Sequence, residues 1–257
     1  ATEQAFNDAH NGDPCPTGTG CGERHTAWPG VVVVDPRLSG ALVFYEKEET
    51  SPTGAFSFRS VGTSIAIWPS PDAPALRPEL RPDLPDPTVL FPEDEPGWGS
   101  AAVVDGDFLF AYACEGGNLS VPCLLARVPI EAALNRSAWL FYAGSGWSDD
   151  WHAAAPVFDG APLMSVHRSP YLDRFVAYYM VPLGGDMALR TAAHPEGPWS
   201  PEVRFGEAEP ALDGNWDYAL IAHPELSRED GRVEYVSYFR PGVFLDGTIH
   251  LVEVTYR

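Results

Sequence analysis

The chain has 257 residues, 45% of them apolar and 12% aromatic, which is enough for the core of one large all-β domain. Lys and Arg number 16 against 36 Asp and Glu, and the formal net charge is −20. Because nucleic acids and anionic membranes bind basic patches, this charge argues against both as partners. The sequence also has no run of about 18 apolar residues, so no membrane span is expected.

The most regular stretch, residues 161–205, predicts four short β-strands in succession. LMSVHR, DRFVAYYM, DMALRTA and EVRF are rich in β-branched and aromatic residues, and Pro, Gly, Asp or Ser bounds each of them. Four adjacent antiparallel strands within about 45 residues are typical of one blade of a β-propeller.

Similar strand pairs recur along the chain. GVVVVDPRLSGALVFYEK predicts two strands joined by a turn at Pro36–Gly40, and FRSVGTSIAIW and TVLF would add a third and a fourth. Between these last two lies a segment dense in proline, residues 69–87. A loop of that length in a compact domain is usually functional or a covering arm. The repeats occupy about residues 28–92, 98–143, 161–205 and 216–257.

This period and content are typical of a propeller. We therefore expect an all-β fold, a β-propeller, that forms a single domain over residues 1–257. Residues 1–27 are polar and rich in glycine, and they are expected to supply a loop and the strand that closes the fourth repeat, which has no obvious outer strand of its own. Only IEAALN, residues 130–135, has a helical pattern.

Four cysteines form two close pairs, Cys15 with Cys21 and Cys114 with Cys123, in surroundings rich in Gly, Pro, Asn and Ser. Two short-loop disulfides in an exported protein are the expected arrangement, and the protein would then be secreted or on the cell surface. A zinc site is the alternative, although neither pair has the spacing of a CxxC motif. The chain begins at Ala1, so we expect a processed or trimmed product.

Three strings carry a resemblance to a known family: PCLLARVPIEAALNRSAWLFYAGSGW, PLMSVHRSPYLDRFVAYYM and MALRTAAHPEGPWSPEVRF. Over about residues 98–257 the chain resembles a bacterial family catalogued as a domain of unknown function, some members of which are associated with endo-D-arabinanase activity on mycobacterial cell-wall arabinan. The resemblance implies a five-bladed propeller with the active site at the mouth of the central channel. Members usually carry a Gly-Asp-Thr-like acidic motif near the N-terminus, whereas NGD at 11–13 is followed here by Pro and Cys.

Polar residues on the predicted innermost strands are the candidates for a site, because these strands line the channel of a propeller. For each of them a structural hydrogen bond is the competing interpretation. They are His25, Ser100, Ser165, His167, Asp217 and His223.

Glycoside hydrolysis requires two carboxyl groups, one on each side of the sugar bond. Acidic residues near predicted rims are Glu23, Asp149, Asp150 and Asp217, with Glu46 at a strand end. No pair is marked by its spacing, since the partners would come from different blades. Glu23, Asp150 and Asp217 are the predicted catalytic residues.

Tryptophans stand where the repeats begin or in the loop 144–160, and either packing between blades or stacking on sugar rings would account for them. They are Trp28, Trp98, Trp147, Trp151 and Trp216. The loop also holds adjacent carboxylates and an imidazole, so we predict that Trp147, Asp150, Trp151 and His152 line part of a saccharide site near the channel mouth, together with Trp98. Packing between the second and third blades is the alternative for this loop.

The acidic strings EDE (93–95) and SDD (148–150) could hold Ca²⁺, but neither has EF-hand spacing, so a solvated surface is the preferred interpretation and no cofactor is expected. The sequence thus predicts a secreted propeller that hydrolyses a polysaccharide or oligosaccharide, and the resemblance implies an arabinan-type substrate. The alternative is a non-catalytic carbohydrate-binding or surface-interaction module on the same scaffold.

Overall fold

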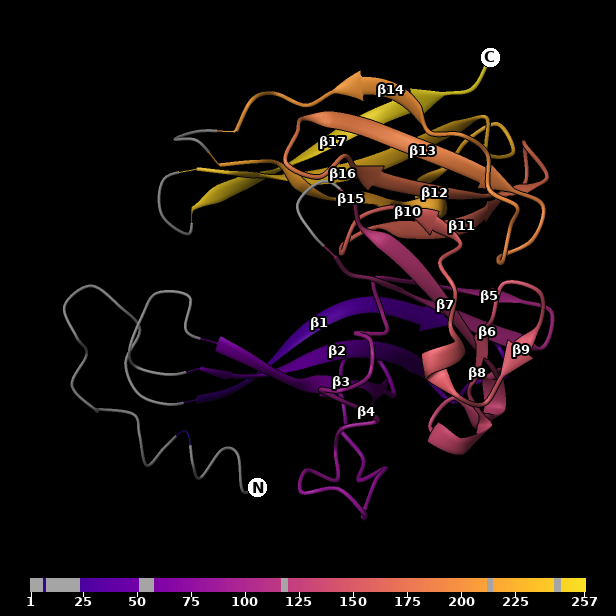
Figure 1. Ribbon diagram of the computed structural model, residues 1–257. Coiled ribbons are helices and arrows are strands. Elements are labelled where there is room, and N and C mark those ends of the chain that lie inside the picture. Colours follow the sequence, from indigo (N-terminus) through magenta and orange to yellow (C-terminus); the bar gives the residue numbers. More distant parts are fainter. Residues whose placement is uncertain (1–6, 8–23, 51–57, 117–119, 212–214, 243–245) are drawn as a thin grey trace. The chain divides into compact units, whose positions relative to one another are not determined.

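The computed structural model describes residues 7, 24–50, 58–116, 120–211, 215–242 and 246–257 (Figure 1). The chain divides into two compact units. The N-terminal unit comprises Ala1–Gly97 and Leu134–Arg136, and the C-terminal unit comprises Trp98–Ala133 and Ser137–Arg257. That all 257 residues form a single domain stays a prediction.

The N-terminal unit contains a four-stranded antiparallel sheet in the order β1-β2-β3-β4. Its strands are β1 (Arg24–Val34), β2 (Ala41–Thr50), β3 (Phe58–Trp68) and β4 (Phe91–Pro92). The expected fourth strand, TVLF, is shorter than predicted and begins later, because the carbonyl oxygen of Thr88 accepts hydrogen bonds from the side chains of Tyr45 and Ser64 instead of joining the ladder. Gly62 lies opposite Pro92, where a side chain would collide with the carbonyl group of Phe91.

The proline-rich segment, residues 69–87, lies against this sheet and is fixed at both ends. Near its start, Ile67 and Leu76 exchange two backbone hydrogen bonds of 2.8 and 2.7 Å. Just after its end, the hydroxyl group of Tyr45 donates to the carbonyl oxygen of Thr88 at 3.0 Å. The segment therefore covers part of the sheet, which is one of the two roles that its length suggested.

The second sheet begins the C-terminal unit, in the order β5-β6-β7-β8-β9 with β10 beside β7. Its strands are β5 (Ala101–Asp105), β6 (Phe108–Cys114), β7 (Pro122–Pro129), β8 (Leu140–Tyr142), β9 (Trp147–Ser148) and β10 (Phe158–Asp159). The pattern IEAALN gives only a single 3₁₀ turn, Ile130–Ala132, and two more such turns follow at Arg136–Ala138 and Trp151–Ala153. Cys114 and Cys123 are register partners on β6 and β7 and form a disulfide, as predicted.

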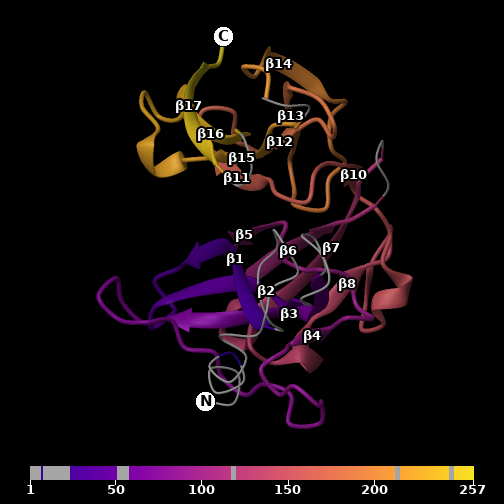
Figure 2. The same ribbon diagram turned by 90° about the vertical axis from the view of Figure 1, so that its left-hand side faces the viewer.

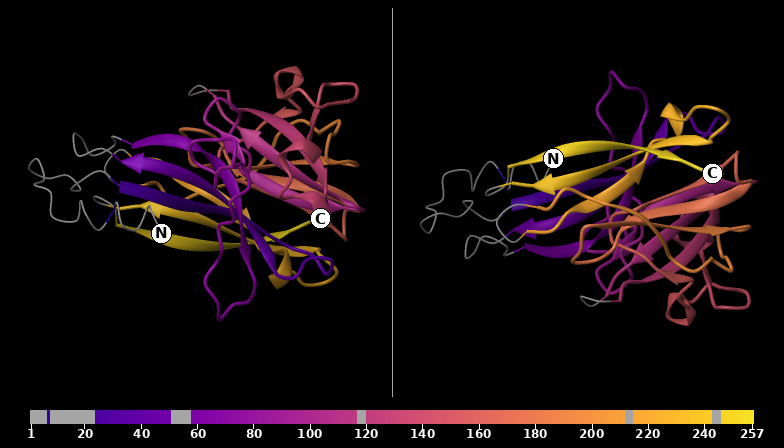
Figure 3. Two further views of the ribbon diagram at one scale, coloured as in Figure 1. Left: turned by 90° about the horizontal axis from the view of Figure 1, so that it is seen from below. Right: turned by 90° about the horizontal axis from the view of Figure 1, so that it is seen from above.

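The third and fourth sheets complete the C-terminal unit. The third has the strands β11 (Ser165–Ser169), β12 (Arg174–Met180), β13 (Asp186–Ala192) and β14 (Val203–Glu207), and the fourth has β15 (Tyr218–Ala222), β16 (Val233–Pro241) and β17 (Gly247–Thr255). A 3₁₀ turn, Pro224–Leu226, follows β15. Neighbouring strands lie side by side in sequence order, as Figure 3 shows for the yellow strands of the fourth sheet. The four strands expected within 161–205 are confirmed.

The first strands of the second, third and fourth sheets begin beside one another. The amide of Met164 donates to the carbonyl oxygen of Ser100 at 3.2 Å, and Met164 also forms a parallel bridge with Leu220. The hydroxyl oxygen of Ser165 accepts a hydrogen bond of 2.8 Å from the amide of Ala222. β5, β11 and β15 are therefore the inner strands of successive blades, and Figure 2 shows β11 next to β15.

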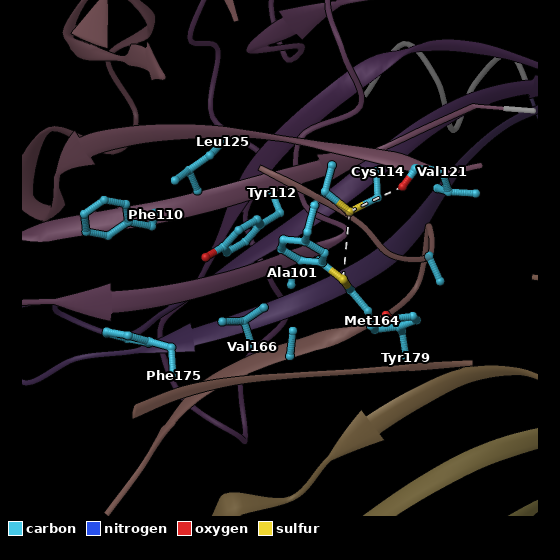
Figure 4. Close-up of a cluster of buried hydrophobic side chains, with 14 of the residues drawn as sticks. Ala101, Phe110, Tyr112, Cys114, Val121, Leu125, Met164, Val166, Phe175 and Tyr179 are labelled. Atoms are coloured by element: carbon cyan, nitrogen blue, oxygen red, sulfur yellow. Dashed lines mark hydrogen bonds between the residues drawn. A yellow bond between two sulfur atoms is a disulfide. The ribbon is translucent and has the colours of Figure 1, made fainter. Parts of the chain in front are cut away.

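Two apolar clusters hold these sheets together. One packs β5, β6 and β7 against β11, β12 and β13, and it includes Tyr112, Phe175 and Met164, whose sulfur lies 3.8 Å from that of Cys114 (Figure 4). The other packs the third sheet on the fourth through Tyr178, Leu220 and similar residues. Burial of such side chains is the main source of stability in this unit.

Candidate functional site

Asp217 is a buried carboxyl group at the start of the inner strand β15. Asp217 is only 3% exposed. Its atom Oδ1 accepts no hydrogen bond from any residue that the structure describes. Burial raises the pKa of this carboxyl group, although the positive charges of Arg240 and His250 oppose the change. A carboxyl group in such surroundings is held in the protonated form to higher pH than an exposed aspartate.

The residues on either side of Asp217 are exposed aromatic side chains. Trp216 is 53% exposed and Tyr218 is 40% exposed. The Tyr218 ring packs on that of Phe239, with 5.2 Å between the ring centroids, and Phe239 is in register with Ile249 on the next strand. Exposed aromatic side chains thus stand on both sides of Asp217 in the sequence, and aromatic rings of this kind suit the C–H faces of sugars.

Neighbouring loops fix the surroundings of Asp217. The hairpin turn between β12 and β13 approaches it, since a Cβ atom at Gly185 would lie 4.0 Å from Oδ2. Arg240 is held by the carbonyl oxygen of Pro210 at 3.0 Å and by the carboxylate of Glu209 at 3.4 Å. His250 is stacked on Tyr238, with 5.0 Å between the ring centroids.

Glu209 supplies a second carboxylate to this neighbourhood. It is solvent-exposed and lies 3.4 Å from Arg240, whose positive charge also opposes the rise in the pKa of Asp217. One carboxyl group is therefore buried and the other is exposed, which is the kind of contrast that separates an acid from a base. Sequence reasoning missed Glu209, and no spacing or motif marks it.

The loop around Asp150 lies elsewhere than expected. It follows β9, at the opposite edge of the second sheet from the inner strand β5, and not beside the inner strand. Oδ1 of Asp150 accepts from the amide and from Nδ1 of His152, at 3.0 and 2.8 Å, and these bonds lower the pKa of Asp150. Trp151 stacks on the His152 ring at 3.8 Å. Asp150 is thus a cap of a 3₁₀ turn, and a saccharide role for this loop stays a prediction.

Two predicted sugar-stacking tryptophans are packing residues in this structure. Trp98 is fully buried and lies 5.3 Å from the Phe141 ring, so no indole face is open to a sugar, and the prediction of a stacking role for Trp98 is corrected. Trp147 is half-buried, and its ring meets Tyr142 and the Arg127 guanidinium of the same sheet at 5.4 and 4.1 Å. These contacts show packing within the second sheet, and neither the saccharide role of Trp147 nor packing between the second and third blades is decided by them.

The serine and histidine candidates make structural hydrogen bonds. Ser165 ties β11 to β15, as described above. Nε2 of His167 lies 3.2 Å from the buried carboxylate of Glu234, which also accepts from the hydroxyl groups of Tyr178 and Tyr256. Burial opposes the ionisation of Glu234, but the hydrogen bonds from His167 and the tyrosines outweigh it and lower its pKa.

The other two histidines are also engaged. His223 contacts the Ser237 hydroxyl group at 2.8 Å through Nε2 and the Glu225 carboxylate at 3.2 Å through Nδ1. The backbone of His25 exchanges two hydrogen bonds of 2.9 Å with the side chain of Asn7. These contacts agree with the competing interpretation of the polar inner-strand residues.

Several predicted features cannot be placed. Glu23 and the Cys15–Cys21 pair lie outside the described residues. Within the described ranges no group of three His, Cys, Asp or Glu side chains could hold a metal ion. In the same ranges no helix has the length and apolar character of a membrane span.

A second unusual acid, Glu48, lies in the N-terminal unit on β2 and was not singled out from the sequence. It is 2% exposed, and burial together with the nearby Glu46 carboxylate raises its pKa to about 7. Its atom Oε2 has no hydrogen-bond partner among the residues described. Glu46 and Glu48 are two residues apart on β2, and alternate residues of a strand face the same side, but only the fold reveals that Glu48 is buried.

The four up-and-down sheets and the adjacent inner strands of the C-terminal unit define an all-β β-propeller, a fold that this chain shares with glycoside hydrolases. The chain belongs to the family described as domain of unknown function DUF4185, which matches residues 86–247. No curated protein sequence matches the chain.

Three solved structures illustrate the likeness in fold. A protein from Bacteroides ovatus, provisionally described as a hydrolase, has a TM-score of 0.59 and 16% identity, over 86% of this chain and 56% of its own. A family 117 glycoside hydrolase from the marine bacterium Zobellia galactanivorans has a TM-score of 0.51 and 11% identity, over 93% and 63%. A thermostable family 43 glycoside hydrolase has a TM-score of 0.50 and 12% identity, over 93% and 74%. At these identities the similarity concerns the fold alone, and the chain spans less than two thirds of the first two.

Proposed function

We propose that this chain is a secreted, carbohydrate-active propeller of the glycoside hydrolase type, with Asp217 as its catalytic acid. The observation that carries the proposal is the buried carboxyl group of Asp217, with its raised pKa, between the exposed rings of Trp216 and Tyr218. The substrate would be a polysaccharide or oligosaccharide, and the resemblance described above favours an arabinan. The residues that the structure describes form four sheets, so a fifth blade is not among them. The five-bladed type is therefore part of the same proposal.

The chemistry follows from the two carboxyl groups. Cleavage of a glycosidic bond needs an acid that protonates the leaving oxygen, and a carboxyl group can do so near neutral pH only if its pKa is raised. Burial shifts the pKa of Asp217 in this direction, and its buried Oδ1 atom has no hydrogen-bond partner among the described residues. Glu209, which forms an ion pair with Arg240, would serve as the second carboxyl group.

The test is the substitution Asp217→Asn, which keeps the shape of the side chain and removes the acid. Purified native and variant chains would be incubated with mycobacterial D-arabinan, plant L-arabinan and xylan, and released reducing ends would be measured. Loss of a positioned general acid costs about 10²- to 10⁴-fold in rate. Asp149→Asn, at an exposed aspartate, is the matched control. Equal hydrolysis by native protein and Asp217→Asn would refute the assignment.

A non-catalytic carbohydrate-binding module is the second candidate. The observation in its favour is that the predicted serine and histidine candidates are engaged in structural hydrogen bonds, while Trp216 and Tyr218 remain exposed. Binding of a polysaccharide without any product, weakened by Trp216→Ala and unaffected by Asp217→Asn, would favour this function over hydrolysis.

A further inference from the structure

A cavity of about 700 Å³ lies in the N-terminal unit between the first sheet and the proline-rich segment. This volume is within the range of cavities that bind small molecules. The strands supply a charged wall that includes Lys47, Glu49 and Arg59. The segment supplies an apolar wall of Leu84, Pro85 and Pro87, flanked by the charged residues Arg77, Glu79 and Asp86. The lining thus combines one apolar patch with charged groups around it.

The apolar wall is held in a defined conformation. The amides of Leu80 and Arg81 both donate to the carbonyl oxygen of Pro87, at 2.7 and 3.0 Å, and this closes the segment into a loop. Prolines within the loop restrict the backbone further, because the ring fixes φ. A cavity with preformed walls loses little conformational freedom when a ligand binds.

The inner end of the charged wall is a buried ion pair. The Lys47 side chain is 3% exposed and is paired with Asp86, whose other oxygen accepts from the amide and the hydroxyl group of Thr88 at 3.0 and 2.7 Å. Burial opposes the ionisation of Asp86, but the hydrogen bonds from Lys47 and Thr88 outweigh it and lower its pKa. Lysine and aspartate therefore neutralise one another at this end.

The outer end is a network around Arg59. Its guanidinium donates to the Glu49 carboxylate at 2.7 Å and to the Glu93 carboxylate. The ring of His25 lies 3.7 Å from Glu49 on the other side. Donors and acceptors therefore alternate around the opening of the cavity at fixed positions.

This pattern selects the chemistry of the ligand. An anion would meet the carboxylates of Glu49 and Glu93, and a cation would meet Lys47 and Arg59. A neutral polyol avoids both conflicts, since each hydroxyl group can donate to a carboxylate and accept from a guanidinium. The C–H face of a sugar ring matches a wall of leucine and proline, and its hydroxyl groups match the charged wall.

We propose that this cavity binds a neutral saccharide unit, with its ring against Leu84 and Pro85 and its hydroxyl groups against Arg59 and Glu49. The proposal does not rest on hydrolysis at Asp217, because the cavity and that carboxyl group belong to different units. It gives the N-terminal unit a binding function of its own.

The test is calorimetric titration of the Asp217→Asn chain, which keeps the probes intact if they are substrates. The probes are three neutral trisaccharides, α-1,5-L-arabinotriose, xylotriose and maltotriose, with trigalacturonate as the anionic comparison. Val61→Trp fills the cavity from β3, and Arg59→Gln removes the central donor of the opening. Val34→Trp, at an exposed position of β1 outside the cavity, is the matched control.

We expect at least one neutral trisaccharide to bind, and both cavity variants to weaken binding by about tenfold or more while Val34→Trp leaves it unchanged. Trigalacturonate should neither bind nor compete. The inference is overturned if no neutral trisaccharide binds, if Val61→Trp binds as well as the control, or if trigalacturonate binds more tightly. Failure of trisaccharide binding in this cavity would refute this inference and leave the proposed hydrolysis untouched. Hydrolysis retained by Asp217→Asn would refute the proposed function and leave this inference untouched.

Discussion

Replacing Glu48 by glutamine should stabilise the protein at neutral pH. Glu48 is a buried carboxyl group on β2, and burial followed by the Glu46 carboxylate raises its pKa from 4.5 to about 7. Below about pH 4.5 the side chain is protonated in both the folded and the unfolded chain. Between these two values only the folded chain keeps the proton, so unfolding releases one, and the free energy of unfolding falls as the pH rises.

The size of the effect follows from the two pKa values. They differ by about 2.5, and each unit corresponds to about 1.36 kcal/mol, so the native chain loses up to about 3 kcal/mol between pH 4.5 and 7. Above pH 7 the group is ionised in both states and the loss is complete. Glutamine has nearly the same shape and no charge, so Glu48→Gln should not show this loss.

The assay is urea unfolding at several pH values from 4.5 to 8, for the native chain, Glu48→Gln and the exposed control Glu131→Gln. The native chain and the control should become less stable over this interval relative to Glu48→Gln, with the largest difference at and above pH 7. A difference between native and Glu48→Gln that is constant with pH, or that shrinks as the pH rises, would show that Glu48 does not titrate as a buried acid.

Three further substitutions test contacts of the fold. Cys114→Ser with Cys123→Ser removes the disulfide between β6 and β7 and should lower the free energy of unfolding by about 2 to 4 kcal/mol, measured in urea; an unchanged value would mean that the bond does not constrain the unfolded chain. Arg136→Met leaves the buried Glu95 carboxylate without its bidentate partner at 2.7 and 3.0 Å, and should lower the free energy of unfolding by about 3 kcal/mol at pH 7. The loss should be smaller at pH 4, because burial raises the pKa of Glu95 and the carboxylate can then take up a proton. Tyr178→Phe removes the hydroxyl group that donates to Glu234 at 3.0 Å and should cost about 1 to 3 kcal/mol, with Tyr171→Phe, at an exposed ring, as the control that should change little.

The strand pattern could be predicted where its signals are local. The alternation and turn residues within 161–205 correspond to β11–β14, and the nearby cysteines 114 and 123 lie opposite each other because β6 and β7 are neighbouring antiparallel strands. The fourth strand of the first sheet was less accurate. Whether the carbonyl group of Thr88 joins a ladder or meets the side chains of Tyr45 and Ser64 depends on residues far away in the chain.

The candidate site could be predicted only in part. Asp217 was among the expected catalytic residues because it begins an inner strand, which the repeat pattern locates. Glu209 and Glu48 were missed, since the sequence has no signal for the ion pair of Glu209 with Arg240 or for the burial of Glu48. The loop from Trp147 to His152 was expected near the inner strands, but its position at the outer edge depends on pairing between β8 and β9.

Asp150 and Asp217 show why residue type alone does not assign a role. Both are aspartates beside a tryptophan, and both were predicted to be catalytic. Asp150 is exposed, and hydrogen bonds from His152 lower its pKa, which favours the ionised form. Asp217 is buried, and loss of hydration raises its pKa, which favours the protonated form. An acid that must protonate a leaving oxygen needs the buried environment of Asp217, and the exposed, hydrogen-bonded environment of Asp150 works against that role. The same reasoning predicts that Asp150→Asn leaves any hydrolysis of arabinan nearly unchanged while Asp217→Asn abolishes it; the reverse order of effects would place the chemistry at the edge of the second sheet.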